Sequence, residues 1–348
     1  MKICFLINKD LNPNTFAFIY PILINLNNFK KLSIDIKFDI SNKNYDLIFL
    51  DSKYLIKHFL KNELVQIEGI FKDLKKKTNY LVYCDNEASI FINKDIFKFI
   101  DYYLKGRIPK ELDTYKKALY GQRQYTDFYY KKYQIKDDIE NYSNILIDDN
   151  ISKIILGWNN GISDYSYLSL IKKNIYKFSN FFIKINKRKI YNKKRIFTGR
   201  FKQTYSRNTI NFHRELYEKL FSIKCEIDRI SRFSYFKELK DSLFSISPFG
   251  WGEICYRDFE SFLYKCVLIK PNMEHIITWP NYYIENKTYL PMAWDDLDEE
   301  LVNNIPENIE KYIHIANTGN INYLKYFNTN DENYFFEHFS NIINKIIK

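Results

Sequence analysis

Short apolar runs alternate with helix-length segments along the first part of the chain, and this alternation constrains the fold more than any other feature. Strand-like runs cover residues 2–8, 33–40, 45–50 and 80–85, and helical stretches at 15–26 and 63–77 separate them. Strands that are separated by helices pair in parallel and are covered by those helices. The sequence therefore predicts an α/β fold built on parallel sheets.

Two acidic residues stand at the ends of strand-like runs in this region. Asp51 directly follows the run 45–50, and Asp85 ends the run 80–85. In open parallel sheets, ligands bind beyond the carboxyl ends of the strands. We therefore expect both carboxylates on the functional rim of the first sheet.

Residues 245–298 carry the densest functional signal. Gly250 and Gly252 bracket a turn that leads into a helical run with Arg257 and Glu260. A loop that enters a helix N-terminus offers free backbone N–H groups and a positive dipole end, which suit a phosphate. A spacing of three places Arg257 and Glu260 on one helix face, where both can reach one ligand.

The same segment resembles a known family. The pattern R-D-F-E-S-F-L-Y-K-C-V-L-I, followed further along by T-Y-L-P, is similar to the C-terminal donor-binding half of GT-B glycosyltransferases. The closest likeness is to the "glycosyl transferases group 1" branch with its CgeB-like proteins. The resemblance implies two Rossmann-like domains that face each other across a cleft, with a nucleotide-sugar held mostly by the second.

The resemblance also implies roles for two glutamates. The family's helix glutamate contacts the ribose or sugar of the donor, and Glu260 takes that position. Glu253 is the partner glutamate, although six residues separate the pair where the wider superfamily has seven. A second departure is Lys265, which stands where the family has glycine.

The expected organisation has four parts. Residues 1–170 form the acceptor-side domain, 171–194 a basic hinge, 195–330 the nucleotide-sugar-binding domain, and 331–348 a helix that packs back toward the N-terminal domain. The run R-I-F-T-G-R-F at 195–201 is similar to the first strand and loop of the second domain. The donor-binding candidates are Thr198, Gly199, Arg200, Gly250, Gly252, Glu253, Arg257, Glu260 and His275.

These candidates also have structural alternatives. Glu260 and Arg257 could simply pair with each other on a helix surface, and the two glycines could be ordinary turn residues. His275 could be a satisfied buried histidine.

The implied reaction is sugar transfer from a nucleotide-sugar to a hydroxyl acceptor on a glycan, a lipid-linked molecule or a protein. Basic residues and the helix N-terminus would stabilise the leaving diphosphate in place of a metal. An inverting enzyme needs a general base from the first domain, and the candidates are Asp51, Asp85 and Asp127. We expect no cofactor beyond the nucleotide-sugar co-substrate.

No metal site is expected either. Asp296 and Asp298 match the D-x-D pattern of another glycosyltransferase class, but the surrounding W-D-D-L-D-E-E-L is more typical of a helix N-cap with an acidic first turn. The sequence has no His/Cys cluster with zinc spacing.

The net charge of +11 is concentrated in one window. Residues 165–214 contain 14 Lys and Arg and no Asp or Glu, so the remainder is slightly acidic. A solvated lysine-rich surface is the simplest interpretation. An anionic membrane, a phosphate-bearing substrate and nucleic acid are the functional ones.

Two alternative functions follow from these features. Lys and Arg interleaved with aromatic residues suit single-stranded nucleic acid. However, the charge lies around the expected hinge and not on a recognisable binding module, which disfavours nucleic acid as a partner. The second alternative is a catalytically inactive GT-B-like interaction protein, because Lys265 replaces the family glycine.

Localisation follows from hydropathy and cysteine content. The apolar run 16–26 contains Pro21, is too short to span a bilayer, and has no signal-peptide cleavage site. The five cysteines are odd in number and lack a C-x-x-C motif, which indicates free thiols in a reducing compartment. We expect a cytoplasmic protein with peripheral contact to the cytoplasmic face of the inner membrane.

Overall fold

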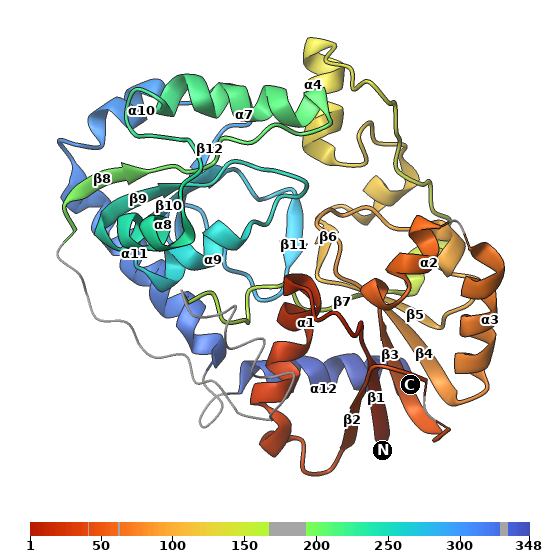
Figure 1. Ribbon diagram of the computed structural model, residues 1–348. Helices are drawn as coiled ribbons and strands as arrows, with labels where there is room; N and C mark the ends of the chain where they lie inside the picture. The colour runs from red at the N-terminus through yellow and green to blue at the C-terminus, as the bar shows by residue number, and fades with distance from the viewer. Residues whose placement is uncertain (41, 62, 167–192, 328–332) are drawn as a thin grey trace.

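The computed structural model describes residues 1–40, 42–61, 63–166, 193–327 and 333–348. Two sheets of parallel strands form the framework, and helices cover each of them (Figure 1). The predicted α/β fold with two Rossmann-like units is therefore confirmed. Of the predicted hinge, only Lys193 and Lys194 belong to the described residues, and much of the basic window also lies outside them.

The first sheet has six parallel strands in the order β2-β1-β3-β4-β5-β7. The strands are β1 (Lys2–Leu6), β2 (Ser33–Lys37), β3 (Tyr45–Asp51), β4 (Thr78–Asp85), β5 (Tyr102–Lys105) and β7 (Ile154–Leu156). Residues on both faces of β3 are buried, because helices cover both sides of the sheet. The Asn12-Pro13 signal begins α1, since the Asn12 side chain accepts hydrogen bonds from the backbone N–H groups of Asn14 and Thr15.

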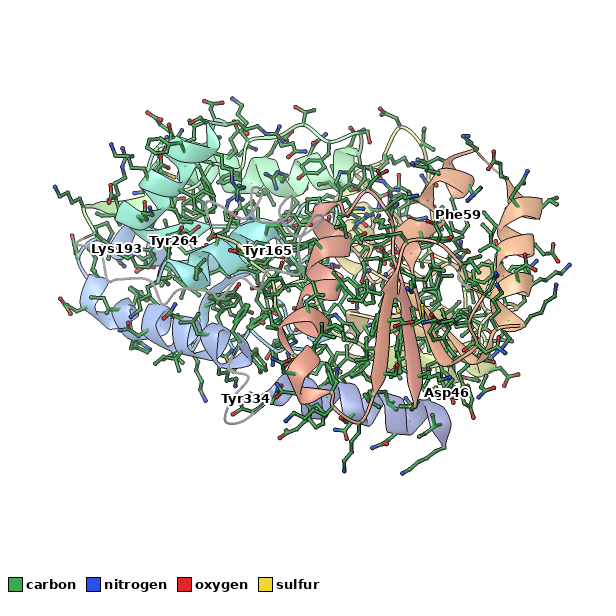
Figure 2. The ribbon with its side chains drawn as sticks, turned by 60° about the horizontal axis from the view of Figure 1, so that its bottom comes forward. Asp46, Phe59, Tyr165, Lys193, Tyr264 and Tyr334 are labelled. Atoms are coloured by element: carbon green, nitrogen blue, oxygen red, sulfur yellow. The ribbon has the colours of Figure 1, made fainter. Side chains whose placement is uncertain are left out.

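The second sheet has four parallel strands in the order β12-β10-β9-β8. They are β8 (Arg195–Thr198), β9 (Ser242–Ile246), β10 (Val267–Pro271) and β12 (Tyr289–Met292). Lys193 anchors the start of this half, because its Nζ donates to the backbone oxygen of Tyr264 at 3.0 Å and to that of Ser242 at 2.5 Å. Figure 2 shows Lys193 and Tyr264 side by side.

The helices fall into two groups along the chain. Those before the second sheet are α1 (Pro13–Ile24), α2 (Ile56–Leu60), α3 (Leu64–Lys75), α4 (Gln124–Tyr133) and α5 (Asp148–Ser152). Those that follow β8 are α7 (Asn208–Phe221), α8 (Arg232–Asp241), α9 (Tyr256–Leu263), α10 (Glu299–Asn304), α11 (Ile309–Leu324) and α12 (Tyr334–Ile347).

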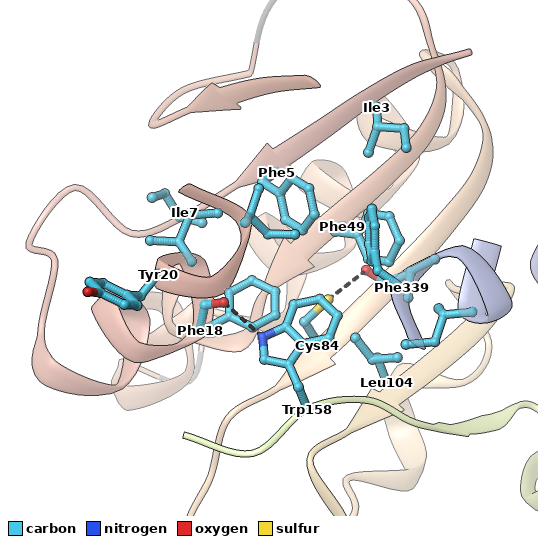
Figure 3. Close-up of a cluster of buried hydrophobic side chains, with 14 of the residues drawn as sticks. Ile3, Phe5, Ile7, Phe18, Tyr20, Phe49, Cys84, Leu104, Trp158 and Phe339 are labelled. Carbon is cyan, nitrogen blue, oxygen red and sulfur yellow. Dashed lines mark hydrogen bonds between the residues drawn. The ribbon is translucent and has the colours of Figure 1, made fainter. Parts of the chain in front are cut away.

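The last helix, α12, returns to the first sheet and completes its core. Phe339 lies 5.6 Å from Phe49 and 5.9 Å from Phe5 between ring centroids, and all three rings are fully buried (Figure 3). Trp158 stacks on Phe18 at 5.1 Å, and its indole N–H donates to the Phe18 backbone oxygen at 2.8 Å. Both ends of the chain therefore lie on the first unit.

Two elements cross the boundary between the halves. The short strand β6 (Arg107–Pro109) pairs antiparallel with β11 (Ile276–Thr278). Helix α4 lies within the segment that the sequence assigns to the first domain, yet its Tyr125 and Tyr129 share a hydrophobic core with Phe249 of the second half. Figure 1 shows α4 at the end of α7. The aromatic side chains of α4 explain this difference, since Tyr125 packs on Phe249 at 5.0 Å and Tyr129 on Phe212 at 5.3 Å.

Within the described ranges, no helix combines the length and apolar character needed to cross a bilayer. All five cysteines are unpaired, and Cys4, Cys84 and Cys266 are buried.

Phe339→Ala should destabilise the protein by about 3–5 kcal/mol, the usual cost of deleting a buried phenylalanine ring. Urea unfolding of the two proteins measures the change. Lys345→Ala, on the exposed side of the same helix, is the control and should unfold like the parent. Equal stability of Phe339→Ala and the parent would contradict the packing of α12 on the first sheet.

Candidate functional site

The start of helix α9 is fixed by Asp258, which is fully buried. Its carboxylate accepts hydrogen bonds from Ser247 Oγ at 2.5 Å, from Tyr283 Oη at 2.8 Å and from the Cys255 backbone N–H at 3.0 Å. Lys270 Nζ, also fully buried, lies 3.0 Å away. These contacts join the helix N-terminus to the segment after β9 and to β10, and so they fix the wall of the neighbouring pocket.

A pocket of about 650 Å³ lies at this helix start, between the segments that follow β8 and β9. We call it the arginine pocket, because cations dominate its charged lining. Those cations are Arg200, Lys202, Arg214, Arg229, Arg232 and Arg257, and the lining has one carboxylate, Glu260. This excess of positive charge beside a helix N-terminus favours an anionic ligand.

Arg214 and Arg257 are two cations of this pocket that donate hydrogen bonds to backbone oxygens. Arg214 Nη1 donates to the Phe249 backbone oxygen at 2.9 Å, and Arg257 Nη2 to that of Arg200 at 2.5 Å. In both, the Nε atom is buried and has no hydrogen-bond partner in the described part of the chain. Neither has a carboxylate within 4.0 Å among the described residues. Burial lowers the pKa of Arg214, and the charge of Arg257 adds to the shift.

The side chains of Arg200 and Thr198 both bond to Glu238 of α8 and so hold β8 against that helix. Arg200 Nη2 lies 2.6 Å from Glu238 and 2.8 Å from Glu226, and Thr198 Oγ1 donates to Glu238 at 2.6 Å. A Cβ atom on Gly199 would lie 3.1 Å from the Phe201 ring, so this glycine allows close packing. Of these three candidates, only Arg200 lines the arginine pocket.

Glu260 lies in the wall of the arginine pocket. The side chain is largely buried, and Tyr235 Oη donates to Glu260 Oε2 at 2.7 Å. Burial raises the pKa of Glu260, and the Tyr235 hydrogen bond and the charge of Arg257 only partly offset this. The structure therefore brings together Arg200, Arg257 and Glu260 as the sequence led us to expect, in one pocket.

Other residues of the protein pack closely against both turn glycines, so the space beside them is not open to a ligand. A Cβ on Gly252 would lie 1.6 Å from the backbone oxygen of Ala88, and one on Gly250 would lie 2.7 Å from Tyr205 Oη. We expected close approach of a ligand to this backbone. Instead, Ala88 of the first half occupies the space beside Gly252, because the two halves are in contact there.

Glu253 and His275 form a separate buried pair. Glu253 Oε1 lies 3.7 Å from His275 Nε2, and neither side chain is among those that line the arginine pocket. Burial is the largest influence on the pKa of Glu253 and raises it, but His275, the backbone N–H of Glu253 and Arg107 together make the net shift downward. The His275 ring packs edge-on against Trp294 at 4.7 Å.

The candidate bases lie in two different places. Asp51 and Asp85 end the neighbouring strands β3 and β4, and Asn86 Nδ2 donates to Asp51 at 3.0 Å. Asp51 also accepts from Thr15 Oγ1 at 2.7 Å, whereas Asp85 pairs with Lys105 at 2.7 Å.

Asp127 lies on α4 in another pocket, and its carboxylate is paired with Lys131 at 2.6 Å. In this conformation all three carboxylates already have hydrogen-bond partners.

Several pocket residues were missed by sequence reasoning. Trp251, which is 42% exposed, and Tyr205 line the arginine pocket, and they are joined by Arg229, just before α8, and by Arg232, the first residue of α8. Trp251 could have been found, since it stands between the two glycines. The two arginines lie in no motif, and only the fold brings them to the pocket.

Two findings bear on metals. Asp298 is the N-cap of α10, as the sequence pattern predicted, and its side chain accepts from the Leu301 backbone N–H at 2.7 Å. Among the residues that the structure describes, no three or more His, Cys, Asp or Glu side chains are grouped so that they could hold a metal ion.

Comparisons with known proteins give similarity in structure only. No protein-family model matches the chain, and no curated protein sequence matches it. Among solved structures, a glycosyltransferase from Rickettsia africae is similar at a TM-score of 0.47 and 11% identity, with 100% of this chain and 98% of that one covered.

Two further structures have similar scores. Anabaena HepE in complex with UDP and glucose has a TM-score of 0.45 and 9% identity, covering 100% and 99% of the two chains. S. aureus MnaA bound to UDP has a TM-score of 0.42 and 10% identity, covering 99% and 96%. Likeness at this level does not by itself identify an activity.

Glu260→Gln should stabilise the protein more at pH 8 than at pH 4. The pKa of Glu260 is higher in the folded protein than its ordinary value of 4.5. The protonated side chain therefore contributes to stability below pH 4.5, and that contribution is lost as the pH rises through the pKa of the folded state. The neutral glutamine avoids that loss. Thermal unfolding of both proteins from pH 4 to pH 8 tests this, and an advantage that shrinks with rising pH would contradict it.

Lys270→Met should cost about 3–5 kcal/mol, because it leaves the buried Asp258 carboxylate without its counter-charge. Urea unfolding measures the loss. The double variant Asp258→Asn/Lys270→Met should recover part of it, because neither charge then remains buried alone. If Lys270→Met and the parent unfold at the same urea concentration, the ion pair does not hold α9 in place.

Proposed function

We propose that this chain is a glycosyltransferase that moves a sugar from a nucleoside-diphosphate sugar to a hydroxyl acceptor. The observation that carries the proposal is the arginine pocket at the N-terminus of α9. Its buried guanidinium groups and its position beside the carboxyl ends of parallel strands are what a diphosphate requires. Glu260 offers an acceptor for the hydroxyls of the ribose or of the transferred sugar.

The electrostatics of the pocket suit the departure of a nucleotide diphosphate. Arg214 and Arg257 have no carboxylate partner within 4.0 Å among the described residues, so their charge is available to the leaving group. Preorganised charge of this kind stabilises a developing anion without reorganisation during the reaction. Arg200, held by Glu238 and Glu226, supports the pocket wall instead.

Contact between the halves would keep water from the reacting sugar. Tyr256 lines the arginine pocket, and its hydroxyl donates to Asn14 Oδ1 at the start of α1. Exclusion of water matters because hydrolysis of the donor competes with transfer. Asp51 and Asp85 are buried and bonded to residues of the first half, so either carboxylate must become exposed before it can act on an acceptor hydroxyl.

The acceptor class and the cellular setting are also part of the proposal. Glycans, lipid-linked molecules and proteins all carry suitable hydroxyls. We place the reaction in the cytoplasm, with peripheral contact to an anionic membrane through the basic window, in surface polysaccharide, lipopolysaccharide or protein glycosylation.

Thermal unfolding in the presence of UDP, ADP, GDP, dTDP and CMP tests the donor site. Binding to the folded state at a hundredfold excess over Kd stabilises by about 2.7 kcal/mol. One of these nucleotides should raise Tm, and Arg257→Met should weaken its affinity at least about tenfold, since a charge-assisted contact contributes about 1.5–3 kcal/mol.

Lys311→Met, an exposed cation on α11, is the matched control and should bind like the parent. The proposal fails if no nucleotide shifts Tm, or if Arg257→Met binds as well as Lys311→Met. Tight, salt-sensitive binding of oligonucleotides without nucleotide binding would instead favour a nucleic-acid-binding protein.

A further inference from the structure

A second pocket, distinct from the arginine pocket, lies between α4 and the segment that follows β12. Its volume is about 490 Å³. We call it the tryptophan pocket, because Trp294 and Phe128 line it. Its polar lining includes Thr114, Gln124, Asp127 and Lys117. It shares no lining residue with the arginine pocket.

Trp294 is held rigidly although it is only partly buried. Its indole N–H donates to the Asn272 backbone oxygen at 3.0 Å, and its ring meets Phe128 edge-on at 5.5 Å. Tyr129 Oη donates to the Trp294 backbone oxygen. His275 and Phe249 also meet this ring edge-on, at 4.7 Å and 6.3 Å, and the part of the ring that lines the pocket lies next to hydrogen-bonding side chains. This combination suits the C–H face of a sugar ring, since the face of an aromatic ring is electron-rich.

The charges of this pocket are largely paired. Lys131 pairs with Asp127 at 2.6 Å, and Lys132 pairs with Asp295 at 2.5 Å. The pocket therefore offers hydrogen-bonding groups more than net charge. A neutral ligand with many hydroxyls fits this chemistry better than a phosphate does.

Gln124 supplies an acceptor that the protein itself does not use. Its Oε1 is buried and has no hydrogen-bond partner among the described residues. A buried acceptor without a partner destabilises the fold, and a ligand hydroxyl that bonds to it removes that cost. The terminal amide torsion is soft, so the group can turn to a hydroxyl in the pocket.

The tryptophan pocket adjoins the turn that borders the arginine pocket. Arg123 Nε donates to the Trp251 backbone oxygen at 2.5 Å, and Tyr125 Oη donates to the Gly250 backbone oxygen. Gln124 stands between these two residues in the chain. A sugar in the tryptophan pocket would therefore lie across this turn from the donor.

We propose that the tryptophan pocket binds a neutral pyranose unit of the acceptor glycan. The role of the bound sugar as an acceptor rests on the proposed function, but sugar binding to the tryptophan pocket can be measured separately. Trp294 would stack on the ring, and Gln124 and Asp127 would bond its hydroxyls. The acceptor is then a saccharide rather than a protein or a simple lipid alcohol.

Tryptophan fluorescence of the full chain, titrated with the methyl pyranosides of glucose, galactose, mannose and N-acetylglucosamine, tests this. At least one should give a saturable change in the millimolar range. Gln124→Ala should weaken the affinity by about fivefold, the value of one hydrogen bond. Trp294→Phe should remove the fluorescence change. Gln66→Ala on α3 replaces an exposed glutamine and should behave like the parent.

The proposal is overturned if no pyranoside gives a saturable change, or if Gln124→Ala binds as tightly as Gln66→Ala. Gln124→Ala decides the matter should Trp294→Phe fail to fold. The nucleotide shift of Tm separates this result from the proposed function. If nucleotides bind and pyranosides do not, only the acceptor subsite is lost. If pyranosides bind and nucleotides do not, the sugar site stands and the transferase proposal fails.

Discussion

The buried contact between Asp258 and Lys270 is the constraint on which the candidate site depends. A buried carboxylate is tolerable only when it is paired and hydrogen-bonded, and Asp258 meets both conditions through Ser247, Tyr283 and the Cys255 backbone. Because these partners come from separate segments of the second half, the start of α9 cannot shift independently of the sheet. Arg257 and Glu260 take their positions in the pocket from that fixed start.

The contact between the halves is the second constraint. Gly252 touches Ala88, β6 pairs with β11, and α4 buries its tyrosines against the second core. Both pockets border this junction.

Electrostatics divide the basic residues into two groups. Arg200 forms ion pairs with Glu238 and Glu226. Among the described residues, Arg214 and Arg257 donate hydrogen bonds only to backbone oxygens. Positive charge without a nearby carboxylate is costly to bury, and an anionic ligand compensates that cost. The distinction between a structural and a ligand-binding arginine is a matter of neighbours, which residue type alone does not show.

Part of the site could be predicted from residue spacing. Arg257 and Glu260 lie three apart on one helix, and that local geometry places both on the same face of α9. Gly252 and Glu253 belong to the glycine turn before α9. Gly252 packs against Ala88 and Glu253 lies next to His275, and neither partner is a neighbour in the sequence. Arg229 and Arg232 come from a segment without a motif, so their place in the pocket depends on chain packing.

The sequence by itself determined the alternation of strands and helices and the parallel sheet of the first half, because these follow from local periodicity and from capping residues. The tertiary structure alone decided that α4 packs with the second half, that the glycine turn meets Ala88, and which arginines remain unpaired. Each of these outcomes depends on which surfaces meet, and a pattern of neighbouring residues carries no record of contacts made across a hundred positions or more.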